Sequence, residues 1–209
     1  EHNVPISLVI VPDNNNPKLK ETLKICSDFS IPVQKLRREK ISLDVQEIID
    51  MPCLSLGFPY LFPQSFIEQT RFIVNVHGTL LPKYRGACTL NWVIENGEED
   101  SGVTVHFVDV GCDTGDIILQ RSFPISDFDT GQSLFKKTLE FEPSVVVEAL
   151  QLLYRGNIDL TSQKNLECMQ YPNRKPLHSE LDPSQPLIKL YNKIRAADPD
   201  NYPAYFFIN

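Results

Sequence analysis

Short apolar runs alternate with segments of helical periodicity, and this alternation restricts the possible folds more than any other feature. Residues 6–11 form a continuous apolar run rich in β-branched side chains. Residues 17–29 follow, beginning with Pro17 and carrying apolar side chains at roughly helical spacing. A continuous apolar run is typical of a strand buried in a parallel sheet, and the second pattern indicates a helix that begins at a proline. We therefore expect an α/β fold with a Rossmann-like, mostly parallel sheet flanked by helices.

The same alternation continues along the chain. Further strands are predicted at residues 31–36, 53–58, 71–77, 101–109 and 116–125, and helices or helical turns at 42–49, near 63, at 87–96, 131–154 and about 185–197. Strand 101–109 alternates apolar and polar residues, which predicts one exposed face. Pro143 predicts a kink or a break in helix 131–154. The stretch 157–183 is loop-like, and residues 202–208 are expected to be extended.

The order of elements suggests that the sheet is incomplete at its beginning. A nucleotide-binding type of sheet normally starts with a central strand followed by a helix, whereas residues 6–11 resemble a second strand. We expect a first strand that precedes Glu1. The expected organisation is a catalytic core at 1–156, truncated at its N-terminus, and a C-terminal appendage at 157–209, made of a helix and an extended segment.

Composition excludes several classes of protein. A net charge of −7 argues against general nucleic-acid affinity, because binding a phosphate backbone needs a basic surface. The 5 cysteines lie far apart without a Cys-x-x-Cys pair, so neither a disulfide framework nor a metal site is predicted, and a reducing cytoplasm is the expected location. No apolar run is long enough to predict a transmembrane helix.

Polar side chains end two of the predicted strands. Asn75 and His77 lie two residues apart at the end of strand 71–77, so both point to the same face. Asp113 follows strand 101–109 through a loop that contains Gly111. Ligands of open α/β sheets bind beyond the carboxyl ends of the strands, so these three residues are candidates for one site.

An amide, an imidazole and a carboxylate suit acyl transfer to an amine. Asn75 would donate a hydrogen bond to the oxyanion, His77 would accept the amine proton, and Asp113 would orient the imidazole or relay protons. The alternative is structural: an Asn-x-His pair often only hydrogen-bonds its neighbours, and an Asp in a glycine-containing loop is often a turn residue.

Longer motifs surround these residues. The stretches 75–86, 102–109 and 111–118, together with Asn91 and Trp92, closely resemble the formyltransferases that use 10-formyltetrahydrofolate. The resemblance implies that Asn75 and His77 match the catalytic Asn-x-His-x-x-Leu-Leu-Pro motif and that Asp113 matches the catalytic Asp-x-Gly motif. Gly78 departs from the proline that many members carry after the histidine. The implied activity is transfer of a formyl group by direct attack of an amine.

The resemblance also implies where the folate co-substrate binds. The family holds the pterin largely through backbone groups of two loops. In this chain the matching residues are Phe58, Pro59, Tyr60 and Leu61 in one loop, and Val108, Asp109, Val110, Gly111 and Cys112 in the other. The alternative is that the apolar members of the first loop simply pack in the core.

The C-terminal stretch after residue 170 is similar to that of methionyl-tRNA and amino-sugar formyltransferases. The candidate substrate-binding residues are Lys83, Tyr84, Arg85, Trp92, Arg174, Arg195 and Tyr202. Arginine suits bidentate pairing with phosphate or carboxylate. The alternatives are a solvated basic face, a structural ion pair for Arg195, and core packing for the aromatic residues.

An acidic chain that ends at Asn209 leads us to expect an acceptor other than tRNA. The expected substrate is the amine of a nucleotide-linked 4-amino-4,6-dideoxy sugar, in lipopolysaccharide O-antigen biosynthesis. The partners are then small molecules, with no nucleic acid and no membrane, and related enzymes suggest a homodimer. Three alternatives stay open: a methionyl-tRNA formyltransferase core, a formyltetrahydrofolate hydrolase in which water replaces the amine, and a ligand-binding module without activity.

Overall fold

The computed structural model describes residues 5–14, 16–17, 19–37, 48–156, 158–164 and 166–207. Its main sheet has four strands in the order β3-β4-β6-β7. The strands are β1 (Val9–Pro12), β2 (Val33–Leu36), β3 (Pro52–Leu56), β4 (Phe72–His77), β5 (Arg85–Gly86), β6 (Asp100–Phe107), β7 (Ile117–Pro124) and β8 (Gln170–Tyr171). The helices are α1 (Leu19–Asp28), α2 (Gln64–Ile67), α3 (Thr89–Asn96), α4 (Gly131–Arg155) and α5 (Leu187–Ala196), with a 3-10 helix, η3, at Pro176–Ser179.

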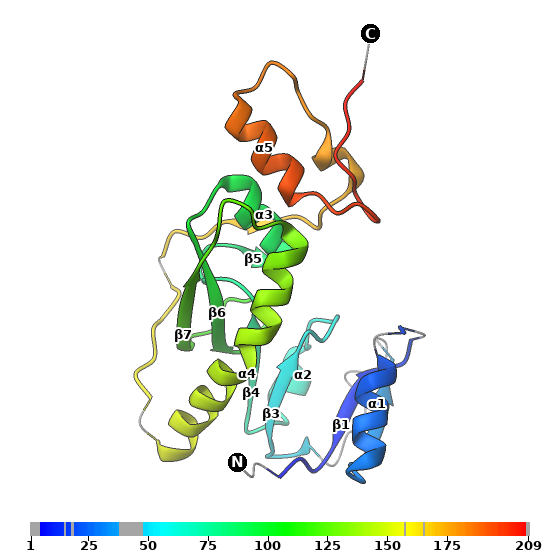
Figure 1. Ribbon diagram of the computed structural model, residues 1–209. Helices are drawn as coiled ribbons and strands as arrows, with labels where there is room; N and C mark the ends of the chain where they lie inside the picture. Colours follow the sequence, from blue (N-terminus) through cyan, green and yellow to red (C-terminus); the bar gives the residue numbers. More distant parts are fainter. Residues whose placement is uncertain are drawn as a thin grey trace.

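The expected α/β fold with a sheet flanked by helices is confirmed (Figure 1). β1 and β2 form a parallel pair, and β3 runs parallel to β4. β6 is antiparallel to both β4 and β7, so the second half of the main sheet is an antiparallel hairpin. The connection between β6 and β7 explains this, because residues 108–116 are too few for the crossover that a parallel pair needs. Most of the predicted segment 42–49 lies outside the described residues.

The prediction of an exposed face on strand 101–109 is wrong. Residues 101–106 of β6 are all buried. Val103 and Val105 pack in a core cluster with Val145 and Ala149 of α4. The opposite face is polar but covered, since Thr104 Oγ1 donates to the Thr79 carbonyl oxygen at 2.6 Å. The alternation of apolar and polar residues along β6 therefore marks two buried faces, one apolar and the other hydrogen-bonded.

Helix α4 is continuous through Pro143, and its two halves run in different directions in Figure 1. Its start is a capping box in which Thr130 and Ser133 exchange side-chain and backbone hydrogen bonds. Its end is Gly156, in the left-handed region with φ 70°. No described helix combines the length and the hydropathy required to cross a membrane.

The C-terminal part of the chain packs back onto the core beside α3 (Figure 1). Asn91 Nδ2 in α3 donates to the Ala196 carbonyl oxygen of α5 at 2.8 Å. Ala196 also joins a buried cluster with Ile94 of α3 and Leu134 of α4. Residues 202–207 contain only isolated β-bridges, including that between Glu180 and Tyr205, instead of a regular strand. The division between residues 156 and 157 stays a prediction.

Two leucines of α4 provide a matched test of this packing. Leu134 is fully buried, whereas Leu139 is 50% exposed. We expect Leu134→Ala to lower the free energy of unfolding by about 2–5 kcal/mol, because it leaves a cavity where α3, α4 and α5 meet. Leu139→Ala should cost less than about 1 kcal/mol. Urea unfolding measures both, and equal losses would contradict the packing described.

Candidate active site

The end of β4 places two of the predicted catalytic residues side by side. Asn75 and His77 both line the same cavity, as their spacing predicts. β4 lies between β3 and β6, and its register sets Asn75 opposite His106 of β6. Asn75 Nδ2 lies 3.2 Å from His106 Nε2. His106 Nδ1 lies 2.7 Å from its own strand's Phe107 carbonyl oxygen, so Nδ1 carries a proton and Nε2 accepts from the amide.

The turn between β6 and β7 brings Asp113 to the same place. Asp113 has φ 54°, in the left-handed region that Asp tolerates better than most residues. Gly115, two residues on, lies against β6 so closely that a Cβ atom would stand 1.9 Å from the Phe107 carbonyl oxygen. A register shift between Val105 and His106 marks an irregularity of the ladder just before this turn. Such irregularities re-aim side chains at sheet ends.

The Asp113 carboxylate is the common contact of the site. Its Oδ2 accepts from the Gly86 backbone N–H at 3.0 Å and lies 3.7 Å from His77 Nδ1. Its Oδ1 accepts weakly from Asn75 Nδ2 at 3.5 Å and lies 3.6 Å from His106 Nε2. The structure therefore brings the three predicted catalytic residues together and adds His106 as a fourth.

The hydrogen bonds of His77 decide which ring nitrogen is free. Nε2 lies 2.8 Å from the Tyr84 carbonyl oxygen. A carbonyl oxygen only accepts, so Nε2 carries the proton and the neutral ring presents the lone pair of Nδ1 towards Asp113. Burial lowers the pKa of His77, and the nearby Asp113 charge and the Tyr84 carbonyl only partly oppose this. The ring is thus a neutral base at neutral pH.

Asp113 stays ionised despite its position. Burial by itself would raise its pKa, but the two histidine rings and the Gly86 N–H outweigh burial and hold the pKa well below its usual range. The neighbouring Cys112 thiol donates to Asp113 Oδ2 at 3.5 Å. Burial and the Asp113 charge raise the pKa of Cys112 to about 11, so this thiol keeps its proton.

The site opens into a cavity of about 400 Å³. Both loops that were predicted to hold the folate line it. The residues of those loops on the cavity wall are Phe58, Pro59, Tyr60, Leu61, Val108, Asp109, Gly111 and Cys112. Val110 is absent from this wall and is 64% exposed. Among the described residues, no group of three or more His, Cys, Asp and Glu side chains is arranged to hold a metal ion.

The seven predicted substrate-binding side chains lie elsewhere. Lys83 pairs with Glu98 at 3.5 Å, and the Tyr84 hydroxyl donates to the same carboxylate at 2.7 Å. The Arg85 guanidinium is buried against Gln163. None of these side chains lines the cavity that holds Asp113, so their role in substrate binding stays a prediction.

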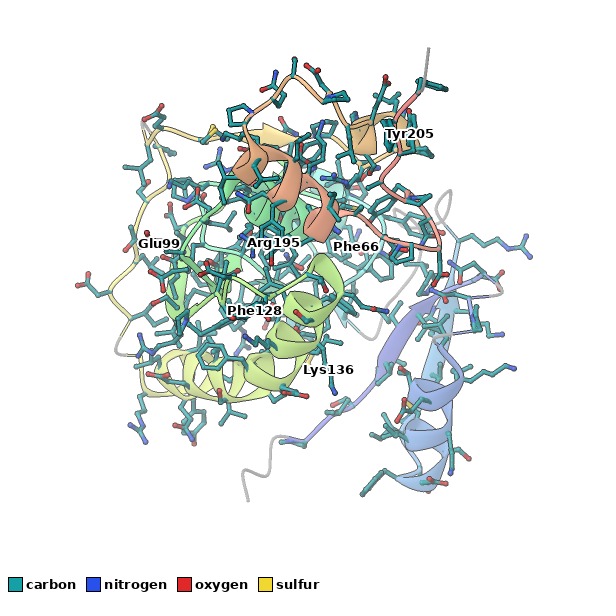
Figure 2. The ribbon with its side chains drawn as sticks, turned by 45° about the horizontal axis from the view of Figure 1, so that its top comes forward. Phe66, Glu99, Phe128, Lys136, Arg195 and Tyr205 are labelled. Atoms are coloured by element: carbon teal, nitrogen blue, oxygen red, sulfur yellow. The ribbon has the colours of Figure 1, made fainter. Side chains whose placement is uncertain are left out.

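The remaining four of these residues pack the C-terminal segment onto the core. The Arg174 side chain is fully buried, with Nη1 2.6 Å from Glu95 Oε2, and its guanidinium lies over the rings of Trp92 and Tyr202. Arg195 Nη1 donates to the carbonyl oxygens of Ser126 and Asp129, between α5 and the turn that precedes α4 (Figure 2).

Two residues of the site were missed by sequence reasoning. His106 sits on a strand with polar alternation, and aligning that strand with strand 71–77 would have placed it beside Asn75. Gln163 donates to the backbone of the Asp113 turn from a loop-like stretch 50 residues away, and nothing in its local sequence points to that contact.

The chain is similar in sequence to known proteins. A family model described as formyl transferase matches residues 22–150. The methionyl-tRNA formyltransferase of Citrifermentans bemidjiense is 30% identical over 214 residues, which cover 98% of this chain and 67% of that protein. The same enzyme of Caldanaerobacter subterraneus is 38% identical over 140 residues, which cover 66% of this chain and 45% of that protein. The chain thus spans about half to two thirds of the length of these relatives.

The fold is also similar to solved structures. WlaRD, described as a sugar 3N-formyl transferase in the presence of dTDP and 5-N-formyl-THF, matches with a TM-score of 0.75 and 27% identity. The match covers 90% of this chain and 68% of that one.

The buried neutral His77 predicts a pH dependence of stability. Below about pH 6.5 the unfolded chain binds a proton at this residue that the folded chain does not, so the free energy of unfolding falls as the pH decreases. Asp113 stays ionised over this pH range, so it does not contribute to the change in the free energy of unfolding with pH. Between about pH 7.5 and about pH 5.5, we expect the free energy of unfolding to fall less in His77→Asn than in the parent protein. Urea unfolding at both pH values measures this, with His178→Asn as the control; an unchanged slope in His77→Asn would contradict the assignment.

Proposed function

The chain belongs to the formyl transferase family, and we propose that it moves the formyl group of 10-formyltetrahydrofolate to an amine. One observation carries this proposal: Asn75, His77 and Asp113 meet at the wall of a cavity that the two loops expected to hold folate also line. A ligand-binding module without activity would have no need for this convergence of amide, imidazole and carboxylate.

The geometry supports a direct attack of the amine on the formyl carbon. Asn75 holds one N–H firmly on His106 and the other only weakly on Asp113, so the second is available to the oxyanion of the tetrahedral intermediate. His77 Nδ1 accepts the proton that the attacking nitrogen loses. The ionised Asp113 stabilises the imidazolium that forms. The new bond joins carbon to the acceptor nitrogen, the bond to N10 breaks, and the proton finally passes to N10.

The cavity also suits a folate. Its wall combines apolar side chains, Phe58, Tyr60, Leu61 and Val108, with Asp109, Gly111, Cys112 and Asp113 of the connection between β6 and β7. Phe58 stacks on Phe62 with 5.2 Å between ring centroids and packs against Tyr60 edge to face at 5.5 Å. An aromatic wall beside polar residues suits a flat heteroaromatic ring with polar edges such as a pterin.

For the acceptor we favour the amine of a nucleotide-linked amino sugar. Two findings support this choice: the likeness to a sugar 3N-formyl transferase, and the net charge of −7, which offers little to an RNA backbone. The 4-amino-4,6-dideoxy sugar expected from the sequence stays a prediction, as do the O-antigen pathway, the cytoplasmic location and the homodimer. Methionyl-tRNA is the second candidate, because the curated relatives at 30% and 38% identity carry that activity in their names.

An acceptor screen tests the proposal. The protein is incubated with 10-formyltetrahydrofolate and, separately, with 3-amino and 4-amino sugars on dTDP, GDP and UDP, with methionyl-tRNA, and with buffer alone. A mass gain of one formyl group on a sugar is the expected result. If only methionyl-tRNA is formylated, the acceptor is methionyl-tRNA and not a nucleotide-linked sugar. Formate release in buffer alone at the full rate would indicate a hydrolase.

Substitution of the base separates chemistry from binding. We expect His77→Asn to lower kcat by about a hundredfold or more, since general base catalysis contributes 10² to 10⁴ in rate. Binding of 5-formyltetrahydrofolate, measured by calorimetry, should change by less than about threefold, because His77 is one of many residues that line the cavity and the apolar part of the wall is intact. His178→Asn, outside the cavity, is the matched control. A kcat within about tenfold of the parent would refute the role of His77 as base.

A further inference from the structure

Gln163 lies in the segment that connects α4 to β8, and it is almost completely buried, with 4% of its surface exposed. The backbone of this segment is hydrogen-bonded to the first residue of β7. Thr161 and Ile117 exchange two hydrogen bonds, at 2.9 and 3.0 Å. Two residues further on, the Gln163 side chain points inward, behind the turn that carries Asp113. We call this connection between β6 and β7, residues 108–116, the Asp113 turn.

Each polar atom of this side chain has partners from another part of the site. Nε2 donates to the carbonyl oxygens of Asp113 at 3.2 Å and Gly115 at 2.6 Å. Oε1 accepts from Arg85 Nε at 3.2 Å and from Arg85 Nη2 at 2.8 Å. Gln163 therefore joins the Asp113 turn to strand β5.

Those two backbone segments are the ones that hold the Asp113 carboxylate. The turn carries Asp113 itself, at φ 54°. Strand β5 carries Gly86, whose N–H donates to Asp113 Oδ2 at 3.0 Å. β5 is in turn paired with β8 immediately after the Gln163 segment, through Arg85 with Gln170 and Gly86 with Tyr171. A non-glycine residue in the left-handed region persists only where its surroundings determine it, and Gln163 supplies two such contacts.

We propose that Gln163 is a positioning residue for the transfer reaction. It sets the distance between Asp113 and His77 by locking the turn against β5, without touching substrate or the reacting atoms. The inference rests on the function proposed above. Displacement of a catalytic group by about 1 Å can lower the rate about a hundredfold. Loss of the Gln163 hydrogen bonds should therefore lower kcat.

The decisive variant is Gln163→Met, which keeps the length of the side chain and removes all four hydrogen bonds. We expect kcat to fall by about tenfold or more, with KM for the folate and the acceptor within about threefold of the parent. Gln163→Glu is the second variant. It retains an acceptor for Arg85 but loses the donor to the Asp113 and Gly115 carbonyls, so the same loss of kcat is expected even if the methionine variant folds poorly.

Gln120 provides the matched control. Its Nε2 also makes two interior hydrogen bonds, to the Leu81 carbonyl oxygen at 2.9 Å and to Thr104 Oγ1 at 2.8 Å, but it makes no contact with the Asp113 turn. Gln120→Met should lower the thermal midpoint to a comparable degree and leave kcat within about twofold. Equal losses of kcat in Gln120→Met and in the Gln163 variants would overturn the proposal.

A readout independent of turnover separates this inference from the proposed function. The chain has only 4 histidines, so the ¹⁵N ring signals of His77 and His106 can be assigned by substitution. Both rings face Asp113, and His77 also faces the Tyr84 carbonyl. We expect both ring signals to move in the Gln163 variants and to stay in place in Gln120→Met. Unmoved signals would overturn the positioning role, whereas absence of formyl transfer by the parent protein would overturn only the proposed function.

Discussion

The buried, ionised carboxylate of Asp113 is the interaction on which the site depends. A charge removed from water is costly unless hydrogen bonds and opposite charge surround it. Here the Gly86 N–H, the Cys112 thiol and the Asn75 amide donate hydrogen bonds to it, and two histidine rings lie beside it. Several features of the fold serve this arrangement: the register that sets Asn75 against His106, the left-handed turn, and the close approach of Gly115 to β6.

Much of this could be predicted from the sequence because it depends on local patterns. Apolar runs and helical spacing give the α/β class, and polar residues at strand ends give Asn75, His77 and Asp113. The role of His106 depends on which residue it faces across an antiparallel ladder, and the parallel sheet that was expected hides that pairing. Buried polar faces are equally hard to predict, since Thr104 in an interior strand has the same sequence pattern as a residue at a solvated face.

The predicted substrate-binding residues show a second limit of sequence reasoning. An aromatic and basic pattern is typical of a ligand pocket, but it is equally typical of a packed junction between segments. Trp92 and Tyr84 both stack on Tyr171, at 5.5 and 4.9 Å between ring centroids, and Arg174 is enclosed with Glu95. The packing seen here depends on where distant segments meet, and only the three-dimensional structure gives that information. Whether the same residues also bind substrate stays a prediction.

This junction has a consequence for dynamics. The segment after α4 crosses the back of the catalytic turn at Thr161 and Gln163, pairs with β5, and continues into the aromatic stack at Tyr171. Its packing and the geometry of Asp113 therefore share the same contacts. Local opening of a segment costs less than global unfolding, so an opening that frees Thr161, Gln163 and β8 would release the turn while the main sheet stays folded. The stability of this segment is thus coupled to the geometry of the candidate active site, although the segment contributes no side chain to the cavity wall.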